Sequence, residues 1–444
     1  MAIKSKNFLV FLIIFSLFSC SKDEAYDKEK AVSAFYQIDP LAVNQENQEV
    51  IIEPQKSVRQ WNYGENFHQN GRVGNFKKEF SYKKNKISLK KLNSIYLDFD
   101  LMSKSDHVFL PVIDGQKIFF LGDSGVIIAY DQKTAKKVWK KRIFDHNFLE
   151  SYKNPKIFGF GDKIFAISGT NEVTAINKGN GSILWKNKLP SLLISKPISD
   201  GELIYIASDK NELYAINVDD GKVVWTHSGI LKNTAIFGAA DPLVYSDKVF
   251  ASYSSGEIYA LNKSNGQEIW SFDLNLSKAI DSDFYLNDID ATPIVNNGVI
   301  YVAGNGGLMM AIDIINGDVI WKKQIATIID FHLAGNFLYI INNDNKLIAL
   351  NKKTGDIKWL KQLEAYENPK KPQTKIIYNG LVMAGDKLLV SNSLGKMLIY
   401  SPINGYLEKE IKVGKKNFHN MIIIDDKIFI HKSGFFGRYF TALK

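Results

Sequence analysis

Cysteine is nearly absent from this chain of 444 residues, which carries only Cys20. An intrachain disulfide is therefore impossible, and a thiolate nucleophile or cysteine-based metal site is excluded from the body of the chain. Histidine is scarce as well. The chain has seven histidines, and they form no close pair at the spacing of metal ligands. A phosphate-binding loop, an HExxH pair and a Ser-His-Asp neighbourhood are also missing. These absences argue against an enzyme.

Long apolar runs are missing too. The apolar stretch at residues 8–18 has about a dozen residues, whereas a helix that spans a bilayer needs roughly 20. It follows Lys4 and Lys6 and ends in Leu17-Phe18-Ser19-Cys20, which is the order of an export signal. Cys20 stands where bacterial lipoproteins carry the cysteine that receives lipid, and Ser21 after it favours the outer membrane. We predict a signal peptide over residues 1–19 and an acylated Cys20; an ordinary secretory signal with a coincidental cysteine is the alternative.

Residues 20–56 have no repeat pattern and carry scattered charges. We predict that they form a flexible tether between the lipidated cysteine and a folded domain over residues 57–444. The net charge of the chain is +9, with lysine pairs spread along it. A basic face could meet lipid phosphates, cell-wall polymer or an acidic partner. Solvated edge and loop lysines are the simpler interpretation, and nucleic acid is not an expected partner of an exported lipoprotein.

The dominant feature that is present is a repeat. Near-copies of one phrase, roughly Asp-Gly-x-Ile-Tyr followed by Gly-x-Leu-x-Ala-Ile-Asn and Asn-Gly-x-x-x-Trp, recur with their tryptophans 38 to 51 residues apart. That period is typical of propellers and other repeat arrays. The tryptophans that close these copies are Trp139, Trp185, Trp225, Trp270, Trp321 and Trp359.

Each copy divides into short strands. In the copy that ends at Trp225, residues 204–206 and 213–216 are apolar and β-branched or aromatic, and Asp219-Asp220-Gly221 is a tight-turn sequence. Three strands are visible, and a fourth fills the interval before the next copy. Four antiparallel strands at this period predict one blade of a β-propeller. Helices are excluded because apolar residues do not recur at helical spacing.

Degenerate copies bring the number of blades to eight. One of them has Lys409 where tryptophan is expected, and the C-terminal copy stops before its last strand. We predict that an N-terminal strand at Ser57–Tyr63, which contains Trp61, completes that last blade and closes the ring. Seven or nine blades remain possible because the copies are unevenly spaced.

The repeat resembles that of the pyrroloquinoline-quinone-like propellers. The lipoprotein cleavage motif Leu17-Phe18-Ser19-Cys20 (the lipobox), the eight copies and the stretch from Leu286 to Pro293 (LNDIDATP) are further features of one family. They resemble the family of the B lipoprotein of the outer-membrane β-barrel assembly machinery. The segments from Phe237 to Pro242 and from Ser254 to Leu261 are similar to the α-proteobacterial form of that family. In the superfamily the tryptophans dock between neighbouring blades. This packing role is simpler than a cofactor role, and we expect no bound cofactor.

The resemblance implies a scaffold on the periplasmic side of the outer membrane. Such a scaffold docks on periplasmic domains of the barrel-forming subunit and helps deliver unfolded outer-membrane proteins to it. Its docking acids match Asp288 and Asp290, whose carboxylates could accept hydrogen bonds from a basic partner. A simple turn cap at Asp288 is the alternative. A second docking element matches Ile230, Leu231 and Lys232, where the loop departs from the family wording.

The competing function is a quinone-dependent periplasmic dehydrogenase, with quinone and metal in the central cavity of the ring. Those enzymes resemble longer chains and commonly carry a vicinal cysteine pair, which this chain lacks. We therefore expect a non-catalytic protein.

Overall fold

The computed structural model describes residues 41, 43, 49–51, 82–83, 86–87, 91–96 and 111–443, except 123, 145–154, 169, 231–239, 275–288, 290, 328, 415–420, 425–426 and 435–436. Residues 43–444 form one compact unit. The predicted signal peptide, Cys20 and the segment Ser57–Tyr63 lie outside the described residues.

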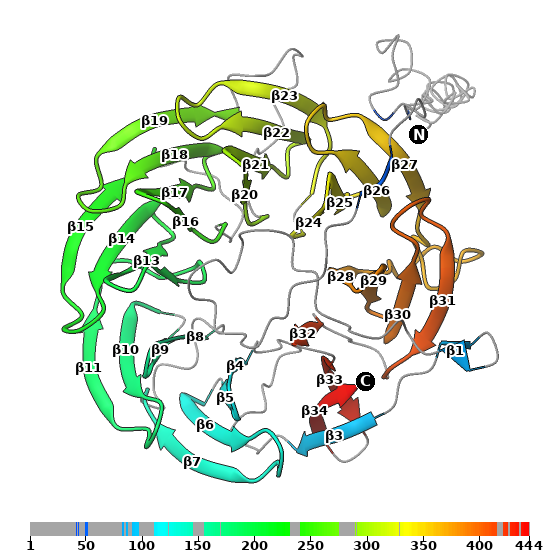
Figure 1. The fold of residues 1–444 in the computed structure, drawn as a ribbon. Coiled ribbons are helices and arrows are strands. Elements are labelled where there is room, and N and C mark those ends of the chain that lie inside the picture. The colour runs from blue at the N-terminus through cyan, green and yellow to red at the C-terminus, as the bar shows by residue number, and fades with distance from the viewer. Residues whose placement is uncertain are drawn as a thin grey trace, which may run out of the picture. The chain divides into compact units, whose positions relative to one another are not determined.

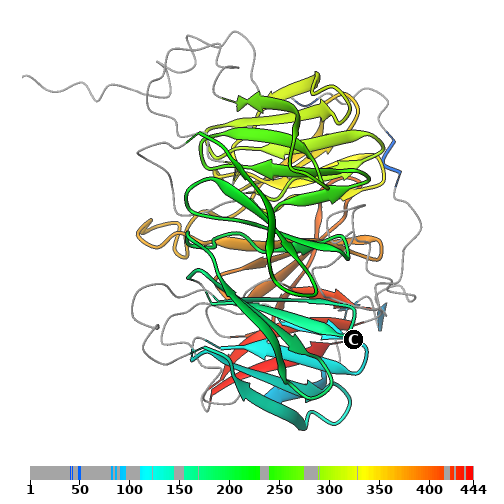
Figure 2. The same cartoon turned by 90° about the vertical axis from the view of Figure 1, so that its left-hand side faces the viewer.

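Among the described residues the strands build eight four-stranded antiparallel sheets. Figure 1 shows these sheets following one another around a common centre, and Figure 2 gives the view from the side. We number the sheets blades 1 to 8 in the chain order of their innermost strands, which are β4, β8, β12, β16, β20, β24, β28 and β32. The prediction of an all-β, eight-bladed propeller of four-stranded antiparallel blades is confirmed.

Blades 1 to 4 are each made from four consecutive strands. Their bounds are β4 (Val112–Asp114), β5 (Lys117–Leu121), β6 (Val126–Asp131) and β7 (Lys137–Arg142); β8 (Lys156–Phe160), β9 (Lys163–Ile167), β10 (Glu172–Asn177) and β11 (Ile183–Lys188); β12 (Ile198–Ser199), β13 (Leu203–Ala207), β14 (Glu212–Asn217) and β15 (Val223–Ser228); β16 (Leu243–Tyr245), β17 (Lys248–Ser252), β18 (Glu257–Asn262) and β19 (Glu268–Asp273).

Blades 5 to 7 repeat this plan, and blade 8 ends the chain. Their bounds are β20 (Ile294–Asn296), β21 (Val299–Ala303), β22 (Leu308–Asp313) and β23 (Val319–Gln324); β24 (His332–Ala334), β25 (Phe337–Ile341), β26 (Lys346–Asn351) and β27 (Ile357–Gln362); β28 (Tyr378–Ala384), β29 (Lys387–Asn392), β30 (Lys396–Tyr400) and β31 (Leu407–Lys412); β32 (Ile422–Ile424), β33 (Lys427–Gly434) and β34 (Gly437–Leu443). A separate hairpin joins β1 (Tyr82–Lys83) and β2 (Lys86–Ile87).

Blade 8 takes its fourth strand from the N-terminal part of the chain. This strand is β3 (Lys91–Tyr96), which pairs with β34 in antiparallel register. An N-terminal strand therefore closes the ring as expected, but its predicted position at Ser57–Tyr63 is wrong. Asn93 lies opposite Ala442, and alanine is also the partner of tryptophan in blades 1 to 6. The closing strand β3 lacks the tryptophan that marks the fourth strands of blades 1 to 6, so the repeat pattern does not reveal it.

Part of the segment assigned to the tether also contacts the ring. Val43 forms a parallel bridge with Ile357 of blade 6. The main-chain N–H of Ile51 donates to the side-chain oxygen of Asn336 at 2.9 Å. The chain therefore joins the compact unit at residue 43, before the expected boundary at residue 57.

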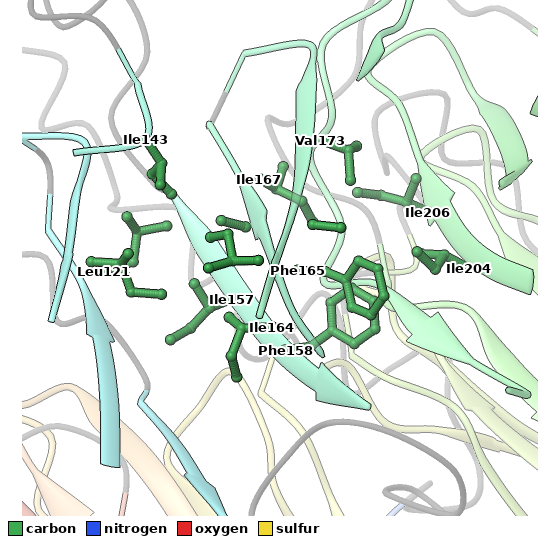
Figure 3. Packing of buried hydrophobic residues seen from close by; sticks show 14 of the residues in the cluster. Leu121, Ile143, Ile157, Phe158, Ile164, Phe165, Ile167, Val173, Ile204 and Ile206 are labelled. Atoms are coloured by element: carbon green, nitrogen blue, oxygen red, sulfur yellow. The ribbon is translucent and has the colours of Figure 1, made fainter. Parts of the chain in front are cut away.

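The core lies between the blades. In blade 3, every residue of β13 is buried, whereas the outermost strand β15 is mostly exposed. A middle strand has a neighbouring blade on each face, so it reads as a continuous apolar run, while a rim strand has water beside it. Figure 3 shows Leu121 of blade 1, Phe165 of blade 2 and Ile206 of blade 3 in one such cluster.

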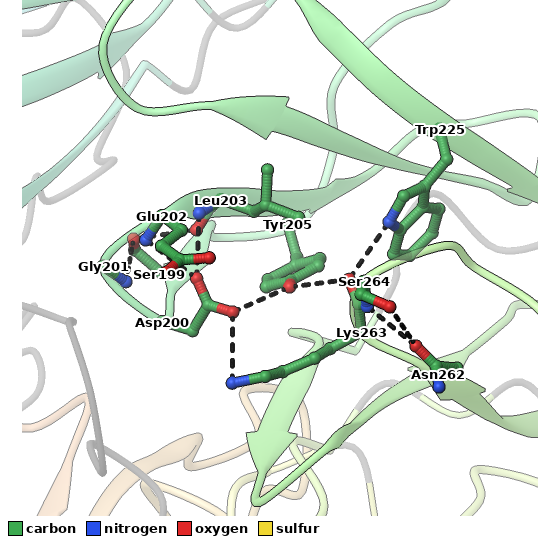
Figure 4. Close-up of polar contacts among 10 residues, drawn as sticks. All are labelled: Ser199, Asp200, Gly201, Glu202, Leu203, Tyr205, Trp225, Asn262, Lys263 and Ser264. Atoms are coloured by element: carbon green, nitrogen blue, oxygen red, sulfur yellow. Dashed lines mark hydrogen bonds and ion pairs between the residues drawn. The ribbon is translucent and has the colours of Figure 1, made fainter.

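The six tryptophans lie on the outermost strands of blades 1 to 6, and each contacts the following blade. Each indole N–H donates to a main-chain carbonyl there, at 2.9 to 3.1 Å. In blade 3 the acceptor of Trp225 is Lys263, whose carbonyl also accepts a hydrogen bond from Tyr205 (Figure 4). The same hydroxyl lies 3.0 Å from Oδ2 of Asp200 and shares its one proton between the two oxygens, and the ring of Tyr205 lies 5.8 Å from that of Trp225. A buried aromatic ring with a satisfied N–H stabilises each junction through apolar area and one hydrogen bond.

A glycine in the next blade makes room for each tryptophan. Gly221 has a φ of +74°, and a Cβ built on it would lie 2.5 Å from Cε3 of Trp185. Gly181, Gly266, Gly317, Gly355 and Gly405 face the preceding tryptophan in the same way. The Asn-Gly or Asp-Gly of the repeat therefore serves the turn and the junction at once, because a side chain there meets both positive φ and an indole.

This arrangement predicts that Gly221→Ala is far more destabilising than Gly298→Ala. Gly298 also has positive φ, at +79°, but a Cβ there meets no atom within 4 Å. The control Gly298→Ala should lose about 1 to 2 kcal/mol of unfolding free energy from backbone strain alone. Gly221→Ala should lose at least about 2 kcal/mol more, because Trp185 must move. Urea denaturation of both variants measures the difference, and equal losses would show that the contact contributes nothing.

Candidate partner-binding face

The antiparallel order of the strands divides the loops between two faces of the ring. Turns that join the first to the second strand and the third to the fourth emerge on one face, which we call the hairpin face. Turns between the second and third strands, and the connections from blade to blade, emerge on the opposite face, which we call the connector face. Ile230 of one predicted docking element, and Ile289 between the two acids of the other, are described and belong to blade-to-blade connections, and so to the connector face.

Ile230 lies just after β15, where its main chain is held on both sides. Its N–H donates to Oε2 of Glu257 at 3.1 Å, and its carbonyl accepts from the side-chain amide of Asn211 at 2.8 Å. Its side chain is 59% exposed. The position therefore offers an apolar side chain to solvent from a fixed backbone. Leu231 and Lys232 lie outside the described residues.

Buried groups support this position from below. Glu257 is buried and also accepts a hydrogen bond from the Ser255 hydroxyl at 3.0 Å. Gly229 packs against the ring of Tyr253, and a Cβ there would lie 2.4 Å from it. Close approach of the backbone is possible only because residue 229 has no side chain.

Asp288 and Asp290 lie outside the described residues, but Ile289 between them is described. Ile289 is fully buried in a cluster with Ala240 and Leu243. Its carbonyl accepts a hydrogen bond from the N–H of Ala240 at 3.1 Å. Ala240 ends the connection that begins at Ile230. The structure therefore joins the two connections that carry the predicted docking residues at their inner ends.

A chain of polar contacts near the inner strands links blades 2 to 6, and we did not predict it. The Lys156 ammonium donates to the carbonyl of Ile194. Asp241 accepts from both the main-chain N–H and the ammonium of Lys196, at 2.6 and 3.0 Å, and the Thr292 hydroxyl approaches it at 3.4 Å. The N–H of Thr292 donates to Asp330 at 2.9 Å. Each contact ties the entry of one blade to the next.

A sequence signal for these residues exists. Lys196, Asp241, Thr292 and Asp330 each stand two residues before an inner strand. The first three precede Pro197, Pro242 and Pro293. Proline holds the preceding residue in an extended conformation, so the same side chain returns to the same place in successive blades.

The surroundings shift the pKa of Lys156 on β8 and that of His227 on β15. Burial of its ammonium lowers the pKa of Lys156 to about 8; nearby Asp241 opposes the shift and Lys196 adds to it. Burial also lowers the pKa of His227, against the opposing charges of Glu268 and Glu257. The neutral ring of His227 is therefore favoured, and its Nδ1 lies 2.9 Å from the Tyr253 hydroxyl.

Within the described part of the chain, no three His, Cys, Asp or Glu residues are grouped closely enough to hold a metal ion. The same residues contain no helix with the length and apolarity needed to cross a membrane.

The lowered pKa of Lys156 predicts a specific pH dependence of stability. Above pH 8 the folded protein releases this proton before the unfolded chain does, so stability should rise with pH until the ordinary lysine range near 10.5. Between pH 7.5 and 9.5, wild type should gain about 1 to 2 kcal/mol relative to Lys156→Met. Urea midpoints at several pH values measure the gain. The exposed Lys210→Met variant is the control, and its stability should rise with pH as that of wild type does. If the stability of Lys156→Met changed with pH in parallel with wild type, the Lys156 ammonium would have no such role.

Comparison with known proteins finds similarity over the middle of the chain. Residues 151–361 match the family model described as "Outer membrane protein assembly factor BamB". The protein of that name from Yersinia pestis is 26% identical over 227 residues, which are 50% of this chain and 58% of that protein. The chain therefore matches less than two thirds of the length of this relative.

Solved structures share the fold. The crystal structure of BamB from Moraxella catarrhalis superposes with a TM-score of 0.65 at 18% identity, covering 80% of this chain and 100% of that one. A europium-containing methanol dehydrogenase superposes with a TM-score of 0.61 at 12% identity, covering 77% and 84%. These likenesses concern the propeller alone, since both kinds of protein have it. The chain is thus similar to BamB in sequence over residues 151–361, and its ring shares the fold of BamB.

Proposed function

We propose that this protein is a non-catalytic scaffold lipoprotein of the outer-membrane β-barrel assembly machinery. Cys20 carries the lipid, and the ring faces the periplasm. The connector face docks on the periplasmic domains of the barrel-forming subunit and aids the assembly and insertion of outer-membrane proteins, including contact with their unfolded chains. The proposal is supported by the similarity to BamB and by the exposed Ile230, whose connection also contains Ala240, which donates a hydrogen bond to Ile289 between the two predicted acids.

The geometry of Ile230 suits a binding hot spot. Its backbone is fixed by Glu257 and Asn211, so exposing and then burying its side chain costs little ordering entropy. Apolar anchors of this kind, rimmed by charge, contribute a large share of interface energy. In this proposal Asp288 and Asp290 are a separate charged contact, and loops positioned by a rigid ring are suited to recognition.

The first test reverses the proposed acids. Asp288→Lys with Asp290→Lys should reduce capture of the barrel-forming subunit by on the order of tenfold, because hydrogen-bonded charges lose their match. The matched control is Asp219→Lys with Asp220→Lys, which makes the same charge change on the hairpin face of blade 3. Capture on beads with purified partner measures both, and melting temperatures should stay close to wild type. Equal capture by the two double variants would show that the two acids do not bind the partner, and would favour the alternative that Asp288 only caps a turn.

The second test removes the apolar anchor. Ile230→Ser should weaken the same capture by about tenfold, as hot-spot truncations do. Ile315→Ser is its control, since Ile315 is 73% exposed on the hairpin face. Adding pyrroloquinoline quinone to the wild-type protein should produce no dye-linked dehydrogenase activity. Quinone-dependent turnover would contradict the scaffold function and support the quinone-dependent dehydrogenase instead.

The third test concerns the anchor. Cys20→Ser should release the protein from membranes, because a single apolar stretch of this length does not span a bilayer. Fractionation and the mass of the mature chain measure it. A Cys20→Ser protein that still pellets with wild-type processing would exclude lipidation at this residue.

A further inference from the structure

Among blades 1 to 7, the residue that follows the outermost strand is buried and apolar in every blade except blade 3. We call this position the exit residue. The exit residues of the other blades are Ile143, Leu189, Leu274, Ile325, Leu363 and Val413, and each is at most 6% exposed. In blade 3 the exit residue is Gly229. Its main chain is held in the ordinary way, because the N–H of Gly229 donates to the carbonyl of Asn211 as the N–H of Leu189 donates to that of Asn171.

A second position differs in the opposite sense. It lies four residues before the third strand of a blade, where the second strand turns into the third, and we call it the facing residue. In blades 1 to 3 and 5 to 7 the facing residues are small or polar, namely Gly122, Ser168, Ser208, Gly304, Asn342 and Asn392. In blade 4 the facing residue is Tyr253, whose side chain is fully buried. Where blade 3 adjoins blade 4, a large facing residue therefore meets an exit residue that has no side chain.

The ring of Tyr253 occupies the space of the missing side chain. A Cβ built on Gly229 would lie 2.4 Å from Cδ2 of Tyr253 and 2.6 Å from Cε2. The hydroxyl of Tyr253 lies 2.9 Å from Nδ1 of His227, on the strand that leads to Gly229. The volume that an exit residue supplies from one blade elsewhere is supplied here from the other blade, so the interior stays filled.

This exchange displaces the chain that leaves blade 3. In blade 2 the side-chain amide of Asn171 donates to the carbonyl of the exit residue Leu189, at 2.6 Å. In blade 3 the matching amide of Asn211 donates to the carbonyl of the following residue, Ile230, at 2.8 Å. The N–H of Ile230 is bound as well, by the buried carboxylate of Glu257 at 3.1 Å. The first apolar residue of this exit is therefore fixed one position later, where its side chain is 59% exposed.

We propose that Gly229 and Tyr253 are positioning residues for partner binding, which together leave the interior filled without an exit side chain and so present Ile230 to the partner. The proposal rests on the proposed function for the role of Ile230. Tyr253 is fully buried, so it acts through the main chain at Gly229 and Ile230 rather than by touching the partner. The exchange also explains the place of the site, since among blades 1 to 7 only the exit of blade 3 has this pair.

The shared space is tested by melting temperatures of the full chain. Gly229→Leu with Tyr253→Ser copies the residues Leu189 and Ser208 at the preceding junction. Each single change should lower the melting temperature by at least about 3 °C, because Gly229→Leu overfills the space and Tyr253→Ser leaves a cavity. The double variant should recover most of this loss, because it restores the total volume. Losses that simply add in the double variant would overturn the proposal.

The positioning role is tested by capture of the barrel-forming subunit. The double variant should capture about tenfold less than wild type although it melts at a similar temperature, because its Ile230 is no longer held in place. Tyr253→Phe keeps the ring and should restore most of the capture lost in Tyr253→Ser. Leu189→Ala, which leaves a cavity at the exit of blade 2, is the control and should capture as wild type does. Wild-type capture by the double variant, with Ile230→Ser defective, would overturn the positioning role while the docking function stands.

A third measurement does not depend on the partner. Hydrogen exchange of the Ile230 amide, followed by NMR of isotope-labelled isoleucine, should be at least about tenfold faster in the double variant, because Glu257 no longer binds this N–H. Unchanged exchange would overturn the proposal. If exchange accelerates as expected but Ile230→Ser captures as wild type does, the two residues fix Ile230 without serving binding, and the proposed function of Ile230 is the part that fails.

Discussion

The contact between a tryptophan of one blade and a glycine turn of the next sets the geometry of this ring. At six of the eight junctions an indole lies on a residue without a side chain and donates its N–H to a carbonyl of the same turn. The contact has both a packing and a directional component, so it fixes distance and angle between blades. A ring closes only if every junction has nearly the same angle, which explains why the phrase is repeated so closely.

Two junctions lack this contact, and both involve blade 8. Lys409 takes the tryptophan register in blade 7, and Asn93 takes it in β3. Apolar clusters bridge these junctions instead, with Met397 and Ile423 in one and Phe120 and Ile422 in the other. Closure therefore depends on strand pairing between β3 and β34, which unites distant parts of the chain, and on packing that has no directional partner.

The separation of the two faces connects the fold to the proposed function. The strands satisfy their main-chain groups within each blade, so the connections are free to vary without disturbing the ring. On the connector face they carry the exposed Ile230 and the buried Ile289. On the hairpin face the short turns serve the junctions, and the turn at Asn336 also binds Glu49 and Ile51.

Much of this architecture follows from the sequence alone. The period, the Gly-x-x-x-Trp phrase and the turn residues predicted the strands and the blades and favoured eight of them, because each copy has the same local pattern. Ile230 came only from the resemblance to a known family. The polar contacts through Lys196, Asp241 and Thr292 could also have been predicted, because these residues recur two positions before an inner strand. They differ in residue type and charge, however, so a comparison of the copies for identical residues does not find them.

Pairing between distant segments was decided only by the tertiary structure. The closing strand at Lys91–Tyr96 carries no tryptophan, and nothing local distinguishes it from its surroundings, because its partner β34 lies more than three hundred residues away. The contact of the N-terminal segment with blade 6 is similar, because Asn336 has the pattern of an ordinary turn residue and only the structure shows Glu49 and Ile51 bound to it. Repeats encode contacts between neighbours in the sequence, whereas contacts between the ends of the chain depend on how the ring has already closed.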